Sequence, residues 1–226
     1  ADDLPALPAR LKVPGQALAA LALARRLRGR GLSHIHAHFA HAPATVAMYA
    51  ARQLGLPFSF TGHAVDLFRD RALLRVKLQR ARFVNCISTW HRAFYQDLVP
   101  RPDAVYPVVR CGVDLDEFAP TERTPGQPPV LLGVGRLVAK KGFDVLLEAA
   151  ARLRARGQAF TVRIAGDGPE SERLSAQCAR LGLGDCVHFL GACPNPLVRK
   201  LLQETDVFVL PCQIDREGDR DGIPVV

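Results

Sequence analysis

Apolar positions in the first half of the chain alternate between helical spacing and short extended runs. Residues 16–31 and 42–55 carry alanine and leucine at helical spacing and end at glycine, which predicts two helices with stop signals. Residues 32–39 form a shorter run that predicts a strand, and residues 57–66 predict a strand that runs into a loop. The alternation continues with helices predicted at 71–81 and 89–99, and with a strand predicted at 82–88.

The same alternation restarts after a polar, proline-rich stretch at residues 118–129, which we interpret as a linker. Strands are predicted at 130–137, 159–168, 186–191 and 207–212. Helices are predicted between them at 142–157, 169–184 and 195–206.

Strands that alternate with helices favour parallel sheets built from right-handed βαβ units. The pattern therefore predicts an α/β chain with two Rossmann-like, doubly wound domains. Residues 1–117 would form part of the first domain and residues 130–226 part of the second. Ligands of such folds bind beyond the carboxyl ends of the strands, so the loops that follow the strands are the places to look for chemistry.

Composition agrees with an ordinary globular protein of one or two domains. The chain has 226 residues, of which 48% are hydrophobic, and no apolar run approaches the ~20 residues that cross a bilayer. None of the six cysteines stands in a CxxC pair, so we expect reduced thiols and a cytoplasmic protein.

The chain is basic, with a net charge of +8 and a pI near 9.6. This charge favours an anionic partner such as nucleotide phosphates, nucleic acid or an anionic membrane face. However, only five of the 30 basic residues are lysines, and the bias of a GC-rich genome toward arginine explains the charge equally well.

The most informative loop follows the strand predicted at 130–137. It reads GVGRLVAKKG and places Arg136 and Lys141 just before a helix. A helix N-terminus carries about half a positive charge and unpaired N–H groups, so two added cations would suit a diphosphate. The alternative is a solvated basic turn. The sequence of this loop matches neither a Walker loop nor a GxGxxG motif.

Two further loops carry candidate residues. In IAGDGPE, Gly166 and Gly168 would let the backbone approach a ligand closely or adopt a positive φ. In TGHAVD, His63 and Asp66 stand at a predicted strand end, although a lone histidine is more often a hydrogen-bonded scaffold residue.

The stretch SHIHAHFAH raises the question of a metal site. On a strand, His34, His36 and His38 share one face, so a metal is geometrically conceivable. No carboxylate stands beside them, which favours histidines that line a cleft or bond to the backbone.

Taken together and in order, these motifs resemble the retaining nucleotide-sugar glycosyltransferases of family 4, which have the GT-B fold. The resemblance runs from about residue 30 to residue 226 and is closest to bacterial exopolysaccharide enzymes of the colanic-acid type. The motifs that carry it are HAHF, TGHAVDLF, RCGVDLDEFAP, GVGRLVAKKGFDVLLEA, IAGDGPE and DREGDRDGIPVV.

The resemblance implies roles for single residues. Arg136 and Lys141 fall on the diphosphate-binding pair, and Gly166 and Gly168 fall on the glycine turn near the nucleotide. His63 would lie near the donor sugar. Asp221, followed by Gly222, falls on the family's first glutamate, for which Glu217 is a weaker rival because it lacks the Gly-x-Pro that follows Asp221.

Asp66 joins Gly222 among the expected substrate-binding residues, while His63 and Asp221 are the expected catalytic ones. The family's second glutamate would follow Val226, and its opening strand would precede Ala1. We therefore expect the chain to be an internal fragment of a longer enzyme, with both domains incomplete.

The implied reaction moves a hexose from a nucleoside-diphosphate sugar to an acceptor hydroxyl with retention, in exopolysaccharide or other cell-surface glycan synthesis. The implied partners are that donor and a glycan or lipid-linked acceptor, with peripheral contact to the inner membrane face and no nucleic acid. No cofactor or metal is implied. Two alternatives stay open: a metal-dependent hydrolase that uses His34, His36 and His38, and a nucleotide-binding fragment without catalysis.

Overall fold

The computed structural model describes residues 12–63, 71–119, 122, 124–222 and 224–226. The chain divides into two compact units, Ala1–Cys111 and Gly112–Val226, which we call unit 1 and unit 2. Each unit contains a parallel sheet with helices between its strands, so the predicted α/β architecture is confirmed. Asp66 lies outside the described residues.

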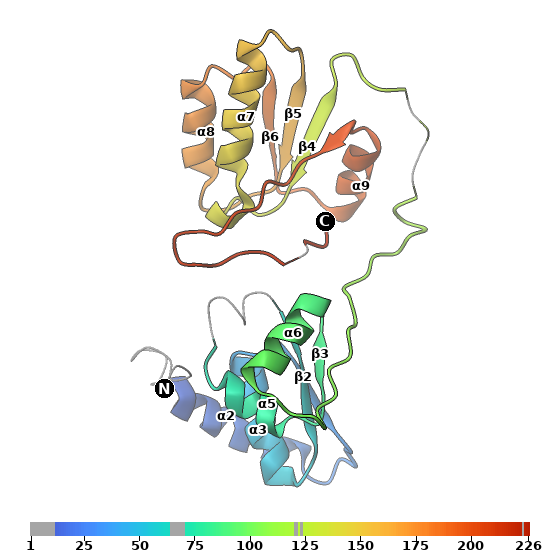
Figure 1. The fold of residues 1–226 in the computed structure, drawn as a ribbon, viewed down its shortest axis with the longest axis vertical. Helices are drawn as coiled ribbons and strands as arrows, with labels where there is room; N and C mark the ends of the chain where they lie inside the picture. The colour runs from blue at the N-terminus through green and yellow to red at the C-terminus, as the bar shows by residue number, and fades with distance from the viewer. Residues whose placement is uncertain (1–11, 64–70, 120–121, 123, 223) are drawn as a thin grey trace. The chain divides into compact units, whose positions relative to one another are not determined.

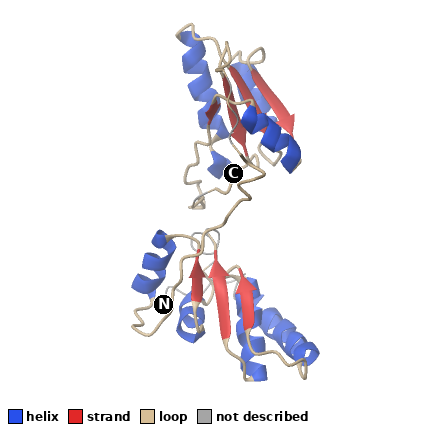
Figure 2. Cartoon of the chain, turned by 90° about the vertical axis from the view of Figure 1, so that its right-hand side faces the viewer, coloured by secondary structure: helices blue, strands red, loops and turns tan. Residues whose placement is uncertain are grey.

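Unit 1 contains a three-stranded parallel sheet in the order β1-β2-β3. The strands are β1 (Ile35–His38), β2 (Phe58–Gly62) and β3 (Val84–Cys86), and Figure 2 shows all three pointing the same way. The described helices are α2 (Lys12–Leu27), α3 (Ala42–Leu54), α5 (Leu74–Arg80) and α6 (Thr89–Leu98).

Alternation along these strands separates a core face from a polar face. Ala37, Phe58 and Phe60 are buried in the hydrophobic cluster that the sheet shares with the helices. Their neighbours His36 and Ser59 are paired in register and therefore lie on the opposite face of the sheet. The polar face of unit 1 consequently gathers the histidines of β1.

Unit 2 contains a four-stranded parallel sheet in the order β6-β5-β4-β7. Figure 1 shows helices on both faces of this sheet, with α7 and α8 on one side and α9 on the other. The strands are β4 (Val130–Val134), β5 (Thr161–Ala165), β6 (Val187–Gly191) and β7 (Val207–Phe208). The helices are the 3₁₀ turn η1 (Ala139–Lys141), α7 (Phe143–Ala155), α8 (Ser171–Arg180) and α9 (Asn195–Gln203).

Two successive residues of β4 pack against helices on opposite faces of the sheet. Leu132 is fully buried in a cluster with Leu201 of α9, whereas Leu131 packs against the cluster that α7 and α8 share. Side chains of successive strand residues point to opposite faces, so one strand anchors both helical layers. This is the doubly wound arrangement predicted from the sequence.

The strand order places a switch point at β4. The chain crosses from β4 to β5 on one side and returns later to β7 on the other. In open parallel sheets such a point opens a crevice beyond the carboxyl ends of the strands, where ligands bind. The loop after β4 and the segment after β7 therefore meet where the sequence predicts chemistry.

No helix among the described residues is both long and apolar enough to cross a membrane.

Candidate donor-binding site

Lys141 and Asp221 meet at the carboxyl end of the unit 2 sheet. Lys141 ends the η1 turn after β4, and Asp221 lies on the segment after β7. The Lys141 Nζ atom is 2.7 Å from Asp221 Oδ2. Two residues that are 80 positions apart and were selected from separate motifs are thus in direct contact.

The pKa of Asp221 is held below its usual range. Burial of the side chain acts to raise this pKa, but the hydrogen bond and charge of Lys141, together with the charge of Lys140, outweigh it. Asp221 is therefore a carboxylate at neutral pH, a form that can accept hydrogen bonds from sugar hydroxyls.

Arg136 lies on the same strand-to-helix connection as Lys141 and is exposed. Among the residues that the structure describes, no hydrogen bond or ion pair engages its side chain. The backbone around it is fixed, because Gly135 N donates to Ala165 O at 3.0 Å and Leu137 N donates to Asp167 O at 2.9 Å. A firmly held backbone with an accessible guanidinium suits the binding of a phosphate group.

The two glycines of the loop after β5 allow it to touch the loop after β4. Gly166 has φ +147°, and a Cβ atom there would overlap the carbonyl oxygen of Gly135. A Cβ atom at Gly168 would lie 2.5 Å from the carbonyl oxygen of Leu137. Both glycines therefore have a packing function next to Arg136, and their contact with a nucleotide stays a prediction.

The remaining candidates of unit 2 are on the surface. Gly222 is exposed, and a Cβ atom there would meet nothing within 4 Å among the described residues. The rival acid Glu217 is also exposed, and its backbone N–H donates to Asp215 Oδ1 at 2.9 Å. Of these two candidate acids, Asp221 is the one that pairs with the lysines of the basic turn.

Lys140 is a residue of the site that the sequence motifs did not indicate; it is 9% exposed and paired with Asp219 at 3.1 Å. In the sequence, Lys140 stands next to Lys141 in a basic loop, a position that is typical of a solvent-exposed lysine. The sequence does contain one indication that both lysines are paired. Asp219 and Asp221 stand two residues apart and supply one carboxylate for each lysine.

His63 belongs to unit 1 and follows β2 directly. Its ring lies 4.6 Å from the ring of Phe39, measured between centroids, and 5.9 Å from that of His38. Phe39 has φ +71°, a left-handed conformation that is unusual for a bulky residue and is often found at functional sites. The contact orients the His63 ring at the carboxyl end of the sheet.

Two other histidines of unit 1, His34 and His36, lie within hydrogen-bonding distance of hydroxyl groups. Ser59 Oγ is 2.6 Å from both His34 Nε2 and His36 Nδ1, and Thr61 Oγ1 is 2.9 Å from His36 Nε2. Burial, and then the neighbouring His38 and His34, lower the pKa of His36, so the neutral ring is favoured.

These contacts bear on the metal hypothesis. Both ring nitrogens of His36 lie within hydrogen-bonding distance of hydroxyl groups, so neither is directed at a shared metal position. Across the described parts of the chain, no group of three or more His, Cys, Asp or Glu residues could hold a metal ion. Nothing in this geometry favours the hydrolase alternative.

Comparison with known proteins identifies the class. The chain shares its fold with the sucrose-phosphate synthase of Thermosynechococcus elongatus, with a TM-score of 0.75 and 19% identity over 89% of this chain and 55% of that one. The fold is the GT-B fold of glycosyltransferases, as the sequence motifs predict. The model "Glycosyl transferases group 1" matches residues 115–226, and "Glycosyltransferase Family 4" matches residues 3–117. The chain belongs to glycosyltransferase family 4.

Curated relatives agree with this family. The chain is 40% identical to a protein of Salmonella typhimurium assigned as the colanic acid biosynthesis glycosyltransferase WcaL. It is 36% identical to the amylovoran biosynthesis glycosyltransferase AmsK of Erwinia amylovora. Each match covers 119 residues, which are 52% of this chain and 29% of the relative. This chain thus matches less than a third of each of these proteins.

Proposed function

We propose that the protein transfers a hexose from a nucleoside-diphosphate sugar to an acceptor hydroxyl with retention of configuration, in the synthesis of an exopolysaccharide or other cell-surface glycan. The observation that carries the proposal is the contact between Lys141 and Asp221 at the switch point of the unit 2 sheet. It joins a cation suited to a diphosphate with a carboxylate suited to a sugar. The names of the curated relatives support the exopolysaccharide context.

In this mechanism the bond between the sugar and the diphosphate breaks, and negative charge builds on the departing diphosphate oxygen. Arg136, Lys141 and the N-terminus of α7, which begins just after Lys141, would stabilise that charge electrostatically. The sugar gains oxocarbenium character and is attacked from the face that the diphosphate leaves. Asp221 and His63 would orient the sugar, with Asp66 and Gly222 as further contacts.

Gly166 and Gly168 would place the backbone of their loop close to the nucleotide. Their packing against Gly135 and Leu137 supports this role, because it fixes that backbone beside the diphosphate site. The base, the sugar and the acceptor are to be identified by experiment.

We also propose that the acceptor is glycan or lipid-linked and that the enzyme works in the cytoplasm, at the inner membrane face. The exposed side of α2 and the residues directly after it support a peripheral contact with anionic lipid, because Leu18 is 68% exposed and four exposed arginines follow it. These are Arg25, Arg26, Arg28 and Arg30. Co-sedimentation with phosphatidylglycerol vesicles, compared with neutral vesicles, tests this part.

The donor site is tested with the substitutions Arg136→Ala and Lys141→Ala. UDP, GDP and ADP are titrated into the parent protein by calorimetry, and turnover of the corresponding sugar nucleotides is measured in the same protein. We expect each substitution to weaken binding of the preferred diphosphate and to lower turnover by ~10²- to 10³-fold, because each removes a charge that stabilises the leaving group.

Two matched substitutions serve as controls. Arg156→Ala removes an exposed arginine that follows the far end of α7, and Lys200→Ala removes a lysine whose side chain is 71% exposed. Both should bind and react like the parent. Parental binding by Arg136→Ala and Lys141→Ala, or no diphosphate binding by the parent chain, would contradict the proposed site.

A further inference from the structure

Lys140 is a buried cation that touches the candidate site without belonging to the diphosphate pair. Its Nζ atom is 3.1 Å from Asp219 Oδ2 and 3.4 Å from Asp221 Oδ1. The other oxygen of Asp221, Oδ2, faces Lys141. The two oxygens of one carboxylate are thus divided between two adjacent lysines.

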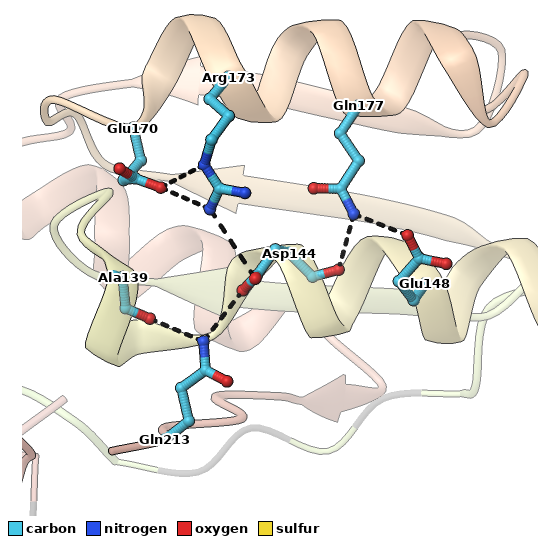
Figure 3. Close-up of polar contacts among 7 residues, drawn as sticks. All are labelled: Ala139, Asp144, Glu148, Glu170, Arg173, Gln177 and Gln213. Carbon is cyan, nitrogen blue, oxygen red and sulfur yellow. Dashed lines mark hydrogen bonds and ion pairs between the residues drawn. The ribbon is translucent and has the colours of Figure 1, made fainter. Parts of the chain in front are cut away.

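The segment that carries these acids is anchored to the η1 turn by other bonds. Gln213 N donates to Lys140 O at 2.9 Å. The Gln213 Nε2 atom donates to Ala139 O at 3.0 Å and to Asp144 Oδ1 at 3.3 Å (Figure 3). The position of Asp221 therefore does not depend on Lys141 alone.

The start of α7 is itself fixed to α8, as Figure 3 also shows. Arg173 Nη2 lies 3.8 Å from Asp144 Oδ2, and Gln177 Nε2 donates to Asp144 O at 3.2 Å and to Glu148 Oε1 at 2.9 Å. The η1 turn and the acidic segment consequently adjoin a helix start that several side-chain contacts hold against α8.

The charges of the cluster balance. It contains two lysines and two aspartates, whose side chains are between 10% and 16% exposed. A carboxylate with so little access to water is costly when it loses its partner. If Lys141 were the sole partner of Asp221, drawing its ammonium toward a diphosphate would leave such a carboxylate uncompensated.

We infer that Lys140 is a positioning residue that keeps Asp221 paired while the Lys141 ammonium moves from the carboxylate to the donor diphosphate. Lys140 also holds Asp221 in place for the sugar. This inference rests on the proposed donor site. The competing explanation is that Lys140 serves only to pair with Asp219 and stabilise the fold.

The test measures diphosphate binding by the 226-residue chain, with UDP, GDP and ADP as probes in calorimetry. Lys140→Met alone leaves Asp219, which is 7% exposed, without its cation, so the informative variant is the double substitution Lys140→Met with Asp219→Asn. Its matched control is Asp219→Asn, which keeps Lys140 available to Asp221. Circular dichroism verifies that each variant is folded.

We expect Asp219→Asn and Lys140→Arg to bind the preferred diphosphate nearly as well as the parent. The double variant should bind about tenfold more weakly or worse, because Asp221 then retains Lys141. Adding Asp221→Asn to the double variant should recover diphosphate binding, since a neutral amide no longer holds the ammonium. A role in stability alone would produce no such recovery.

Equal binding by the double variant and Asp219→Asn would overturn the inference. Lys141→Met separates this failure from that of the proposed function. If Lys141→Met loses binding while the double variant does not, the donor site stands and only the role of Lys140 is wrong. If Lys141→Met binds like the parent, the donor site itself is misplaced.

Discussion

The carboxyl ends of the two sheets hold their polar side chains in different ways. In unit 1, imidazole rings contact hydroxyl groups and aromatic rings, as His36 contacts Thr61 near the end of β2 and His63 contacts Phe39. In unit 2, lysines and carboxylates pair, as Lys141 does with Asp221. Among the described residues, the same parallel-sheet architecture therefore presents imidazole and hydroxyl groups in one unit and a cluster of ion pairs in the other.

The buried cations differ in the same way. Lys77 of unit 1 is fully buried and donates to the carbonyl oxygens of Ala40, His41 and Ala72, at 2.5, 3.0 and 2.6 Å. Lys140 of unit 2 instead pairs with carboxylates. The carbonyl contacts of a lysine hold a loop in place. A lysine in an ion pair can exchange its carboxylate for an anionic ligand. We infer that the buried lysine of unit 1 stabilises loop structure, whereas the lysines of unit 2 are suited to binding an anion.

The largest effect is expected from Gly166→Ala, which should destabilise unit 2 alone by about 4 kcal/mol. The substitution combines a strained φ of +147° with a Cβ atom that overlaps the Gly135 carbonyl. Hydrogen exchange measured separately for peptides of the two units should show lost protection in β4 and β5 and unchanged protection in β1 and β2.

Gly184→Ala is the matched control, because Gly184 is exposed and a Cβ atom there meets nothing within 4 Å among the described residues. Its effect should stay within about 0.5 kcal/mol. Equal stability of the Gly166→Ala and Gly184→Ala proteins would show that the two loops are not packed as described.

The elements of the fold could be predicted from the sequence because apolar spacing and glycine stop signals agree locally. The strands are shorter than predicted, most of all the one at 207–212, of which only Val207 and Phe208 form β7. Beyond them, Cys212 N donates to Leu210 O and Gln213 bonds to the η1 turn, so the chain bends toward the site. The backbone partner of Gln213 is Lys140, about 70 residues away, and no local pattern contains that contact.

The candidate site could be predicted only in part. Motifs selected Lys141 and Asp221, and their contact is a finding of the structure. Motifs could not reveal that Lys140 is buried, because burial depends on how the η1 turn packs against the segment after β7. Nor could they reveal Ser59, a small residue whose hydroxyl meets two imidazoles because of the register between β1 and β2.

A smaller effect is expected from Lys77→Met, which should destabilise unit 1 by about 3 kcal/mol. The substitution removes the donor from three carbonyl groups, at least one of them in a buried contact, and unpaired buried groups are costly. The only tryptophan of the sequence, Trp90, lies in α6 of unit 1, so its fluorescence during urea denaturation reports the loss there.

Lys200→Met is the same substitution at a side chain that is 71% exposed, where a 3.9 Å pair with Glu204 should contribute at most about 0.5 kcal/mol. If Lys77→Met were as mild as Lys200→Met, the carbonyl contacts of Lys77 would contribute little to unit 1. The contrast between the buried cations of the two units would then be wrong.

The smallest expected effect is a pH dependence of the stability of unit 1. The pKa of His36 is lowered in the folded protein, so the unfolded chain binds this proton more readily. Stability contributed by the neutral ring is therefore present above the ordinary pKa of about 6.5 and is lost as the pH falls below it. The lowered pKa of Asp221 acts in a different window, because its contribution is lost only as the pH falls through and below the ordinary carboxyl range.

The urea midpoint followed by Trp90 should consequently decrease between pH 8 and pH 5.5, and His36→Gln should make that decrease smaller. Glutamine keeps a polar group beside Ser59 and Thr61 but does not titrate. Hydrogen exchange in β4 and β5, corrected for its intrinsic pH dependence, should report constant stability of unit 2 over the same interval. A pH response that is equal in both units, or that His36→Gln leaves unchanged, would place the titrating group elsewhere. It would also remove the distinction between the imidazole contacts of unit 1 and the ion pairs of unit 2.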